Sequence, residues 1–332
     1  AMAQTAADSL AIVSADWQTE PLQKGMLYKK AVFSSLYGVP QEVSIFEISP
    51  KRYRFDVLVH NPKEETSIAA RHAGAVAAIN GSYFDMKAGN SVCYLRKDGV
   101  VIDTTSTGVL ATVSNGAVLI KKGRLELIPW SKQEEKACTL KKGTVLASGP
   151  LMLKDGQVCD LSGTNRNFVD TKHPRSAVAL TREGKILLIV VDGRRKGKAE
   201  GINIPELAHM IRILGGEDAL NLDGGGSTTF AAKQEGSDTL TVVNRPSDGY
   251  ERSVSSSLMV VSTAPVSTEF DHALITSTYD YLTSGATVRL VASGVSVSGS
   301  AAELPADITW KSADETIGTV SEAVSYTHLR AH

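Results

Sequence analysis

Short apolar runs separated by turn residues dominate the chain, and most of them have the length of β-strands. Residues 41–48 and 53–59 alternate apolar and polar side chains, which is typical of strands with one buried face. Residues 185–191 are apolar almost throughout and predict a central strand. Other apolar runs predict strands at 10–13, 31–36, 75–79, 145–153, 176–180, 219–222, 239–243 and 255–261.

Helical signals are confined to two segments. In residues 204–214, apolar side chains recur at i, i+3, i+4 and i+7, and Pro205 fits the first helical turn. Residues 64–73 predict a shorter helix. The predicted fold class is therefore α+β, a β-rich mixed sheet with few helices. Asp98-Gly99 and Asn115-Gly116 predict hairpin turns between strands.

The longer helix connects a strand that ends at Asp192 with a strand that ends at Asp223. A strand–helix–strand unit of this kind is expected to be a parallel crossover. The crossover would place both carboxylates at the same edge of the sheet. Glu206 lies in the first turn of the helix, where the helix dipole favours a carboxylate.

Composition excludes several functional classes. The 332 residues are 42% hydrophobic and 21% charged, as in an ordinary globular protein, and the formal net charge of −1 gives no global basic surface for nucleic acid. No run of 18 apolar residues predicts a transmembrane segment. The cysteines, Cys93, Cys138 and Cys159, have no CxxC spacing, so a zinc site is not expected and at most one intramolecular disulfide can form.

The most informative stretch is residues 219–229, in which a buried strand delivers Asp223 to three consecutive glycines and then to three hydroxyl residues. Gly224, Gly225 and Gly226 remove every side chain that would crowd the carboxylate, and they permit close approach of a ligand to the backbone. This pattern favours a site for an anionic or sugar ligand over a simple capped turn.

Polar groups also crowd the ends of other predicted strands. Asn80 and Asp85 follow the strand at 75–79 much as Asn221 and Asp223 follow theirs, so either the two strand ends border one cleft or Asn80 begins a simple hairpin. Arg175 and Arg194 lie at the same end of two strands that should pair. Two guanidinium groups there suit bidentate capture of a phosphate or carboxylate, although a surface Asp–Arg pair is the alternative.

The character of the sequence changes near residue 265, after which Ser, Thr, Val and Ala dominate. We therefore expect a first domain over residues 1–264, which the resemblance described below makes the catalytic one. Residues 265–324 resemble a partial, all-β bacterial Ig-like domain, from Ile308-Thr309-Trp310-Lys311-Ser312 and Ile317-Gly318-Thr319-Val320. Residues 325–332 look like a non-native tail. The N-terminus looks like a mature start with a secretion signal removed, so a secreted, periplasmic or cell-surface location is expected.

An ordered set of motifs between residues 45 and 262 resembles the phosphodiester glycosidase family. The motifs are Ala78-Ile79-Asn80-Gly81-Ser82-Tyr83-Phe84-Asp85, Ala147-Ser148-Gly149-Pro150, His173-Pro174-Arg175-Ser176-Ala177, Val191-Asp192-Gly193-Arg194, Ala219 to Thr229, and Glu251-Arg252-Ser253-Val254. The resemblance implies hydrolysis of a glycosyl-1-phosphodiester of the N-acetylglucosamine-1-phosphodiester type.

With that reaction in mind, we assign roles to the motif residues. Asp223 is the first candidate for nucleophile or base, and Asp192 or Glu206 is the second carboxylate. Arg175 and Arg194 are expected to clamp the phosphate. The other expected substrate-binding residues are Asn80 and Asp85 for sugar hydroxyls, Ser148, Gly149, Gly224, Gly225 and Gly226 for backbone donors, and Ser227 and Arg252.

Three other interpretations fit the same residues. One is a glycoside hydrolase with a neutral leaving group, which needs a carboxylic acid of raised pKa. Another is a non-catalytic carbohydrate-binding surface protein. The third is a metal-assisted hydrolase that uses Asp85, Asp192 and Asp223. We expect a carbohydrate or sugar-phosphate substrate, no nucleic-acid partner and no required cofactor, with a structural Ca²⁺ as an alternative. The sequence carries no signal for an oligomeric state.

Overall fold

The computed structural model describes residues 5–106, 108, 112–279, 283–321 and 326–329. The chain forms two compact units, of which the first comprises residues 1–233 and 239–264 and the second comprises residues 234–238 and 265–332. In the described part of the first unit there are three antiparallel-rich sheets and five α-helices, so the predicted β-rich α+β class is confirmed.

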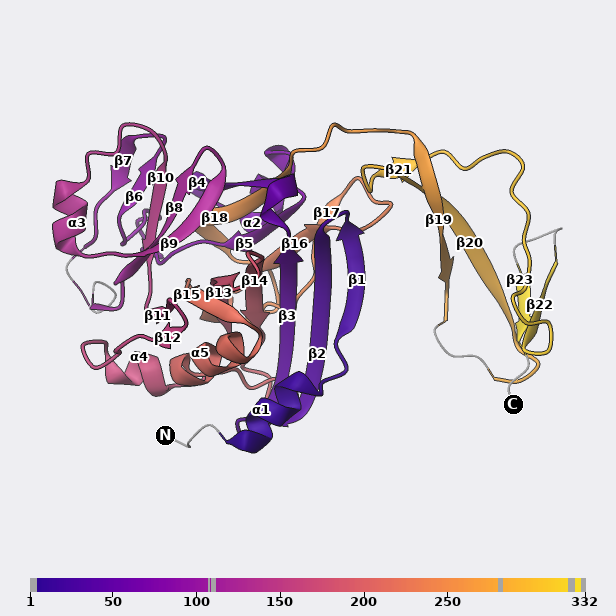
Figure 1. Ribbon diagram of the computed structural model, residues 1–332, viewed down its shortest axis with the longest axis horizontal. Helices are drawn as coiled ribbons and strands as arrows, with labels where there is room; N and C mark the ends of the chain where they lie inside the picture. Colours follow the sequence, from indigo (N-terminus) through magenta and orange to yellow (C-terminus); the bar gives the residue numbers. More distant parts are fainter. Residues whose placement is uncertain (1–4, 107, 109–111, 280–282, 322–325, 330–332) are drawn as a thin grey trace. The chain divides into compact units, whose positions relative to one another are not determined.

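The largest sheet has eight strands in the order β1-β2-β3-β14-β13-β15-β11-β12 (Figure 1). Its strands are β1 (Gln18–Gln23), β2 (Met26–Leu36), β3 (Val39–Ile48), β14 (Ile186–Val191), β13 (Arg175–Thr181), β15 (Gly216–Asn221), β11 (Leu151–Lys154) and β12 (Gln157–Val158). Strands β14 and β15 both run antiparallel to β13, which lies between them. They are therefore parallel to each other, as the predicted crossover requires, and their carboxyl ends share one edge.

Two five-stranded sheets complete the first unit. One has the order β7-β6-β10-β8-β9, and the other β17-β16-β5-β18-β4. The first consists of β7 (Val100–Asp103), β6 (Leu95–Lys97), β10 (Thr144–Ser148), β8 (Gly116–Lys121) and β9 (Arg124–Pro129). The second consists of β17 (Leu240–Val242), β16 (Phe230–Lys233), β5 (Ala77–Asn80), β18 (Ser253–Ser262) and β4 (Tyr53–Glu65).

The main apolar core lies between these sheets, where Phe46 of β3 stacks on Phe230 of β16 with ring centroids 4.1 Å apart. A second core covers the other face of the large sheet, where Leu207 and Met210 of α5 (Ile204–Ile213) are fully buried. Helix α5 begins with a capping box in which Asn203 and Glu206 exchange side-chain and backbone hydrogen bonds. The other helices are α1 (Ala6–Val13), α2 (Thr66–His72), α3 (Lys132–Ala137) and α4 (Arg166–Asp170).

Two local predictions were wrong. Residues 10–13 belong to helix α1 and not to a strand, because Thr5 and Asp8 form a capping box at its start and only Ile12 turns inward. Asn115-Gly116 is not a hairpin turn, because β8 begins at Gly116 and the side chain of Asn115 accepts a hydrogen bond from the Leu151 amide at 2.7 Å. The turn between β8 and β9 falls at Lys122-Gly123.

The second unit contains an antiparallel sheet in the order β19-β20-β23-β22, to which β21 is added through β20. These strands are β19 (Phe270–Ser277), β20 (Thr287–Ser296), β21 (Ala301–Ala302), β22 (Gly318–Ser321) and β23 (Tyr326–Leu329). That this unit is part of an Ig-like domain stays a prediction. Residues 322–325 and 330–332, on which part of the expected Ig-like segment and of the expected tail fall, lie outside the described residues. No helix within the described ranges is long and apolar enough to cross a membrane.

Candidate active site

Two strand ends from different sheets meet at Asp223, as one interpretation of the sequence expected. The Asp223 amide donates to the carbonyl of Gly81 at 3.0 Å, and Asn80 Nδ2 donates to the carbonyl of Asp223 at 2.7 Å. Asn80 Oδ1 accepts from Ser176 Oγ and from the Thr229 amide. Asn80 is fully buried, and its hydrogen bonds join β5 to β13 and to the two ends of the glycine run.

The carboxylate of Asp223 lies in an unusual environment. Burial raises its pKa from 3.8 to about 6. The Ser227 hydroxyl, the Gly224 amide and the charges of Arg252 and Arg175 act in the opposite direction, and the Gly224 amide donates to Oδ1 at 2.9 Å. Asp223 is thus an acid that titrates near neutral pH and is surrounded by cations.

Two of the three glycines make room for arginine side chains. Gly225 has a φ of +62°, and a Cβ built on it would lie 2.9 Å from Nη2 of Arg194. A Cβ on Gly226 would overlap both Arg252 and Asp248. Any larger residue at these two positions would therefore push a guanidinium group out of place.

The sequence predicted that the glycine amides are free hydrogen-bond donors, but two of them already have acceptors within the protein. The Gly224 amide is used by Asp223, and the Gly225 amide donates to the carbonyl of Pro174 at 2.9 Å. The structure thus gives these glycines a different role, which is to supply space and to tie Asp223 to the segment before Arg175.

The three arginines of this region differ in how firmly their side chains are held. Arg175 is 2% exposed, and its Nε and Nη2 donate to the carbonyls of Ile202, Phe168 and Thr171. Burial lowers its pKa to about 10, so it stays charged at neutral pH. Arg252 is held by Asp248 Oδ2 at 2.5 Å. Arg194 is exposed, with a φ of +60°.

Three residues of this region were not among the predicted site residues. Burial and the charges of Arg175 and Arg194 lower the pKa of His173, which keeps its imidazole neutral at pH 7. Tyr83 donates to the carbonyl of Gly149 at 2.5 Å, and burial together with the charge of Asp223 raises its pKa. Asp248 is the third. His173 could have been found from its position beside Arg175, whereas Asp248 sits in a polar loop with no distinguishing signal.

The two candidates for the second carboxylate lie in other surroundings. Asp192 is 3% exposed and accepts from Asn244 Nδ2 at 2.9 Å and from the Arg245 amide at 3.1 Å. Burial raises its pKa. Glu206 caps helix α5 and pairs with Lys172 Nζ at 2.5 Å. Each carboxylate is thus engaged in holding a loop or a helix start.

The remaining predicted residues fall at the margins of the site. Asp85 is exposed and accepts from the amides of Lys87 and Ala88, which lowers its pKa. Its turn adjoins Arg252 through Met86 Sδ. Gly149 contributes its carbonyl, which accepts from Tyr83 and from Asn221 Nδ2, and not a visible donor. Among the described residues, the buried hydroxyl of Ser148 has no hydrogen-bond partner.

Two guanidinium groups near a carboxyl group of raised pKa, with a third against the neighbouring Gly225, can bind an anion, and the carboxyl group can act on an adjacent electrophilic carbon. A metal centre would need a different arrangement. In the part of the chain that the structure describes, no group of three His, Cys, Asp or Glu side chains could hold an ion. The expectations about cofactors and Ca²⁺ stay predictions.

Curated relatives match a large part of this chain. The N-acetylglucosamine-1-phosphodiester alpha-N-acetylglucosaminidases of Mus musculus and Bos taurus are 28% and 29% identical to it over 198 residues. The alignments cover 56% of this chain but only 35% and 34% of those proteins, so the chain spans about a third of their length. Their names indicate a glycosidase.

A solved structure supports the same fold. The zebrafish N-acetylglucosamine-1-phosphodiester alpha-N-acetylglucosaminidase catalytic domain, auto-inhibited by its pro-peptide, superposes with a TM-score of 0.57. The sequences are 20% identical, and the superposition covers 74% of this chain and 87% of that domain. The family model described as "Phosphodiester glycosidase" matches residues 73–261, more than half of the chain, and this range includes Asn80, Asp223 and Arg252. The chain therefore belongs to the phosphodiester glycosidase family.

Proposed function

We propose that this protein hydrolyses a glycosyl-1-phosphodiester of the N-acetylglucosamine-1-phosphodiester type, releasing a free sugar and a phosphomonoester. The observation that carries the proposal is the placement of Asp223, a carboxyl group with a pKa of about 6, near the charges of Arg175 and Arg252, with the exposed Arg194 against Gly225. Membership of the family and the names of its relatives support the same reaction type.

The reaction breaks the bond between the anomeric carbon and the bridging oxygen, and the oxygen leaves with the phosphate. A leaving phosphate is a stable anion, so it needs neighbouring cations more than it needs a proton. Guanidinium groups bind phosphate oxygens through paired N–H donors. We assign this role to Arg194, with Arg175 and Arg252 as fixed charges that help to hold the leaving group.

Asp223 is assigned to the sugar side of the broken bond. Above pH 6 its carboxylate is ionised, and it can attack the anomeric carbon or take a proton from the water that does. His173, whose pKa is lowered by burial and by the neighbouring arginines, is neutral at pH 7 and can donate or accept a hydrogen bond beside the phosphate. Asp192 and Glu206 remain candidates for a second carboxylate, but their contacts support structural roles.

The test compares two substrates that share a sugar, an α-N-acetylglucosamine-1-phosphodiester and an aryl α-N-acetylglucosaminide. We expect Arg194→Gln to lower kcat/KM for the phosphodiester by about 100-fold, as when one charge-stabilising donor is removed, and to change hydrolysis of the aryl glycoside by less than threefold. Arg182→Gln, at an exposed arginine of the β13–β14 turn that pairs with Glu217, is the matched control.

Equal losses on both substrates would contradict the phosphate clamp. Hydrolysis of the aryl glycoside alone would favour the ordinary glycoside hydrolase, and binding of sugar without hydrolysis would favour the carbohydrate-binding protein. Both assays are repeated with EDTA, because loss of activity there would indicate a metal-assisted reaction instead.

A further inference from the structure

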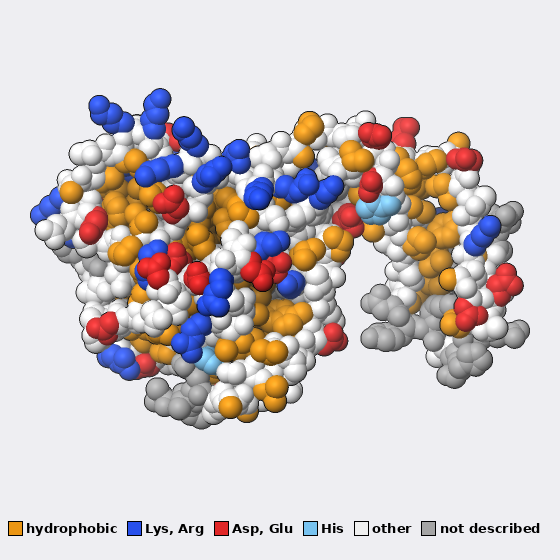
Figure 2. Space-filling model, viewed as in Figure 1, with side chains coloured by type: hydrophobic (Ala, Val, Ile, Leu, Met, Phe, Trp, Pro, Cys, Tyr) orange, Lys and Arg blue, Asp and Glu red, His pale blue; other side chains and the backbone are white. Residues whose placement is uncertain are grey.

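A band of cations lies on the first unit at a distance from the candidate active site. We call it the basic edge and define it as Lys51, Arg52, Arg54, Lys121, Lys122, Arg124, Lys141 and Lys142. All eight are exposed, and within the described ranges none of them forms an ion pair with a carboxylate. Figure 2 shows Lys and Arg side chains gathered along the upper edge of this unit. The concentration is notable in a chain whose formal net charge is −1.

The basic edge is continuous because three chain segments touch there. The Phe55 amide donates to the carbonyl of Gly123 at 2.9 Å, which joins the start of β4 to the β8–β9 turn. A Cβ on Gly143 would lie 3.5 Å from Cγ of Lys121, which joins that turn to residues 141–143. The Gly99 amide donates to the carbonyl of Gly143, so the β6–β7 turn adjoins the same segment.

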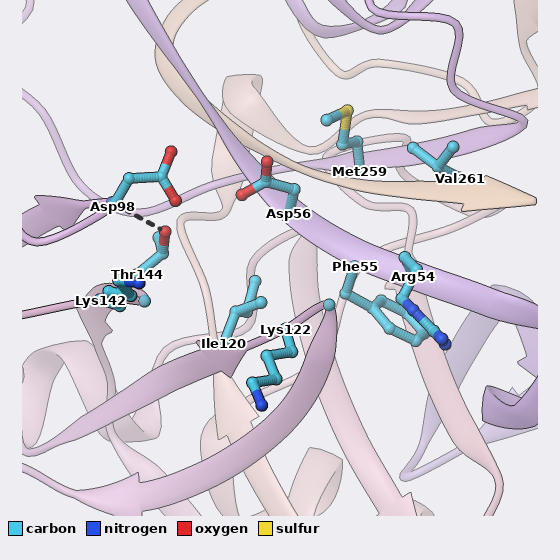
Figure 3. A pocket seen from close by; sticks show the side chains of 12 residues that line it. Arg54, Phe55, Asp56, Asp98, Ile120, Lys122, Lys142, Thr144, Met259 and Val261 are labelled. Atoms are coloured by element: carbon cyan, nitrogen blue, oxygen red, sulfur yellow. Dashed lines mark hydrogen bonds between the residues drawn. The ribbon is translucent and has the colours of Figure 1, made fainter. Parts of the chain in front are cut away.

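A pocket of about 620 Å³ opens within the basic edge (Figure 3). Its apolar floor includes Phe55, Ile120 and Met259, which are nearly buried. Arg54, Lys122 and Lys142 line it together with two carboxylates, Asp56 and Asp98. Figure 3 shows the two carboxylates facing the same space, whereas the Lys122 side chain extends away from them in this view.

A pocket with this lining can bind a ligand that carries hydroxyl groups and carbon faces as well as an anionic group. Cations at the rim suit phosphate groups, carboxylates accept hydrogen bonds from hydroxyl groups, and an apolar floor suits the carbon faces of a polyol or sugar. Asp56 and Asp98 both contact Lys97 Nζ, so their own charge is partly neutralised.

The strands fix the distance between this pocket and the candidate active site. On β18, Ser257 pairs with Asn80 beside the active site, whereas Val261 lines the pocket four residues further along. On β8, Gly116 packs against Leu220 near the site, whereas Lys121 belongs to the basic edge. At about 3.3 Å per residue, the two regions lie on the order of 15 Å apart along these strands. A small phosphodiester in the active site would not reach the pocket, but a chain of several units would.

We propose that the basic edge and its pocket bind a linear polymer of polyol or sugar units linked by phosphodiesters, and hold it while one end occupies the active site. The polymer's role as substrate rests on the proposed function, whereas its binding to the basic edge does not. Unpaired cations over an extended surface bind a chain of regularly spaced phosphates more tightly than a single phosphate, because each added contact releases counterions without a new loss of translational freedom.

The test uses 1,3-linked poly(glycerol phosphate), which contains no glycosidic bond, so its binding can be measured whether or not the protein is a glycosidase. Affinity is measured by titration calorimetry at 50 and 200 mM salt for the wild type and for Lys122→Glu/Lys142→Glu. We expect the double variant to bind at least tenfold more weakly at the lower salt. Its log affinity should also depend less steeply on log salt, with a slope reduced by about one to two.

The matched control is Lys136→Glu/Lys311→Glu, which makes the same change of charge at two exposed lysines outside the basic edge and should bind within twofold of the wild type. Three results would overturn the proposal: equal binding by the Lys122→Glu/Lys142→Glu variant in its folded form, orthophosphate bound as tightly as the polymer, or a heparin fragment of equal charge bound as tightly. The second would show a site for free phosphate, and the third a surface for any polyanion.

Discussion

Asp192 and Asp223 occupy similar places in the fold but have very different surroundings. Each follows a strand of the large sheet, and each precedes a glycine. Their strands, β14 and β15, are parallel, and burial raises the pKa of both groups. On these features alone, the carboxyl ends of β14 and β15 would be equally good places for a catalytic acid.

The loop after β17 makes the difference. Asn244 and Arg245 fold over Asp192 and donate to both of its oxygens, so the carboxylate is used to hold that loop. Asp223 receives one backbone hydrogen bond on Oδ1 and faces the side chains that the glycine run admits. A carboxylate at a strand end is therefore available for chemistry only where no neighbouring segment donates hydrogen bonds to both of its oxygens.

Replacement of Asp223 should have the largest effect on activity. We expect Asp223→Asn to lower kcat for the proposed hydrolysis by at least about 1000-fold, because the amide can neither attack carbon nor take a proton from water. Steady-state kinetics on the phosphodiester substrate measure the loss. Asp192→Asn is the matched comparison and should retain more than a tenth of the activity, whereas a loss as large as that of Asp223→Asn would make Asp192 the second catalytic carboxylate.

The same substitution should stabilise the fold at neutral pH. Because the folded pKa of Asp223 is about 6 and its ordinary value is 3.8, the folded state prefers the protonated form. This preference favours folding below pH 4 and is lost as the pH rises through 6, at a cost of up to about 3 kcal/mol. Asp223→Asn should therefore unfold at a higher temperature than the wild type at pH 7.5 and at a similar temperature at pH 4. If the difference in unfolding temperature between the two proteins grew as the pH was lowered, the pKa of Asp223 would not be raised.

For Asp192 the sign of the effect on stability should be opposite. Asn at position 192 can accept only through its carbonyl oxygen, so either the Asn244 amide or the Arg245 N–H loses its acceptor in a buried place. We expect the free energy of unfolding to fall by about 1–3 kcal/mol, as measured by urea denaturation at pH 7.5. Unchanged stability would mean that this loop does not depend on Asp192.

Substitution in the glycine run should have the smallest of these effects. Gly225→Ala keeps the acid and the arginines but places a Cβ at a φ of +62° and 2.9 Å from Nη2 of Arg194. We expect a loss of stability of about 1 kcal/mol from the backbone and a several-fold rise in KM as Arg194 is displaced. Gly215→Ala, at a φ of +92° where a Cβ meets no neighbour, is the control for the backbone cost alone. Equal KM values in the two variants would show that Arg194 does not bind the phosphate.

Several features of the active site followed from local sequence. Alternation and apolar runs located β3, β4, β13 and β14, because burial on one or both faces of a sheet imposes a period on the side chains. Pro205 marked the start of α5, and Glu206 lies in its first turn as the sequence predicted. With the strands and this helix in place, the handedness and spacing of the crossover brought Asp192 and Asp223 to one edge.

Local sequence was therefore enough to predict most strands of the large sheet, helix α5 and the sheet edge that Asp192 and Asp223 share, since these depend on neighbours close along the chain. Which of the two carboxylates has hydrogen-bond donors on both oxygens depends on the tertiary structure, because the donors to Asp192 come from residues more than fifty positions away. Long-range contacts also pair the Gly225 amide with the carbonyl of Pro174 and the Arg175 Nε with the carbonyl of Ile202. Periodicity fixes which face of an element is buried, whereas the partners of a buried charge depend on which distant segments pack over it.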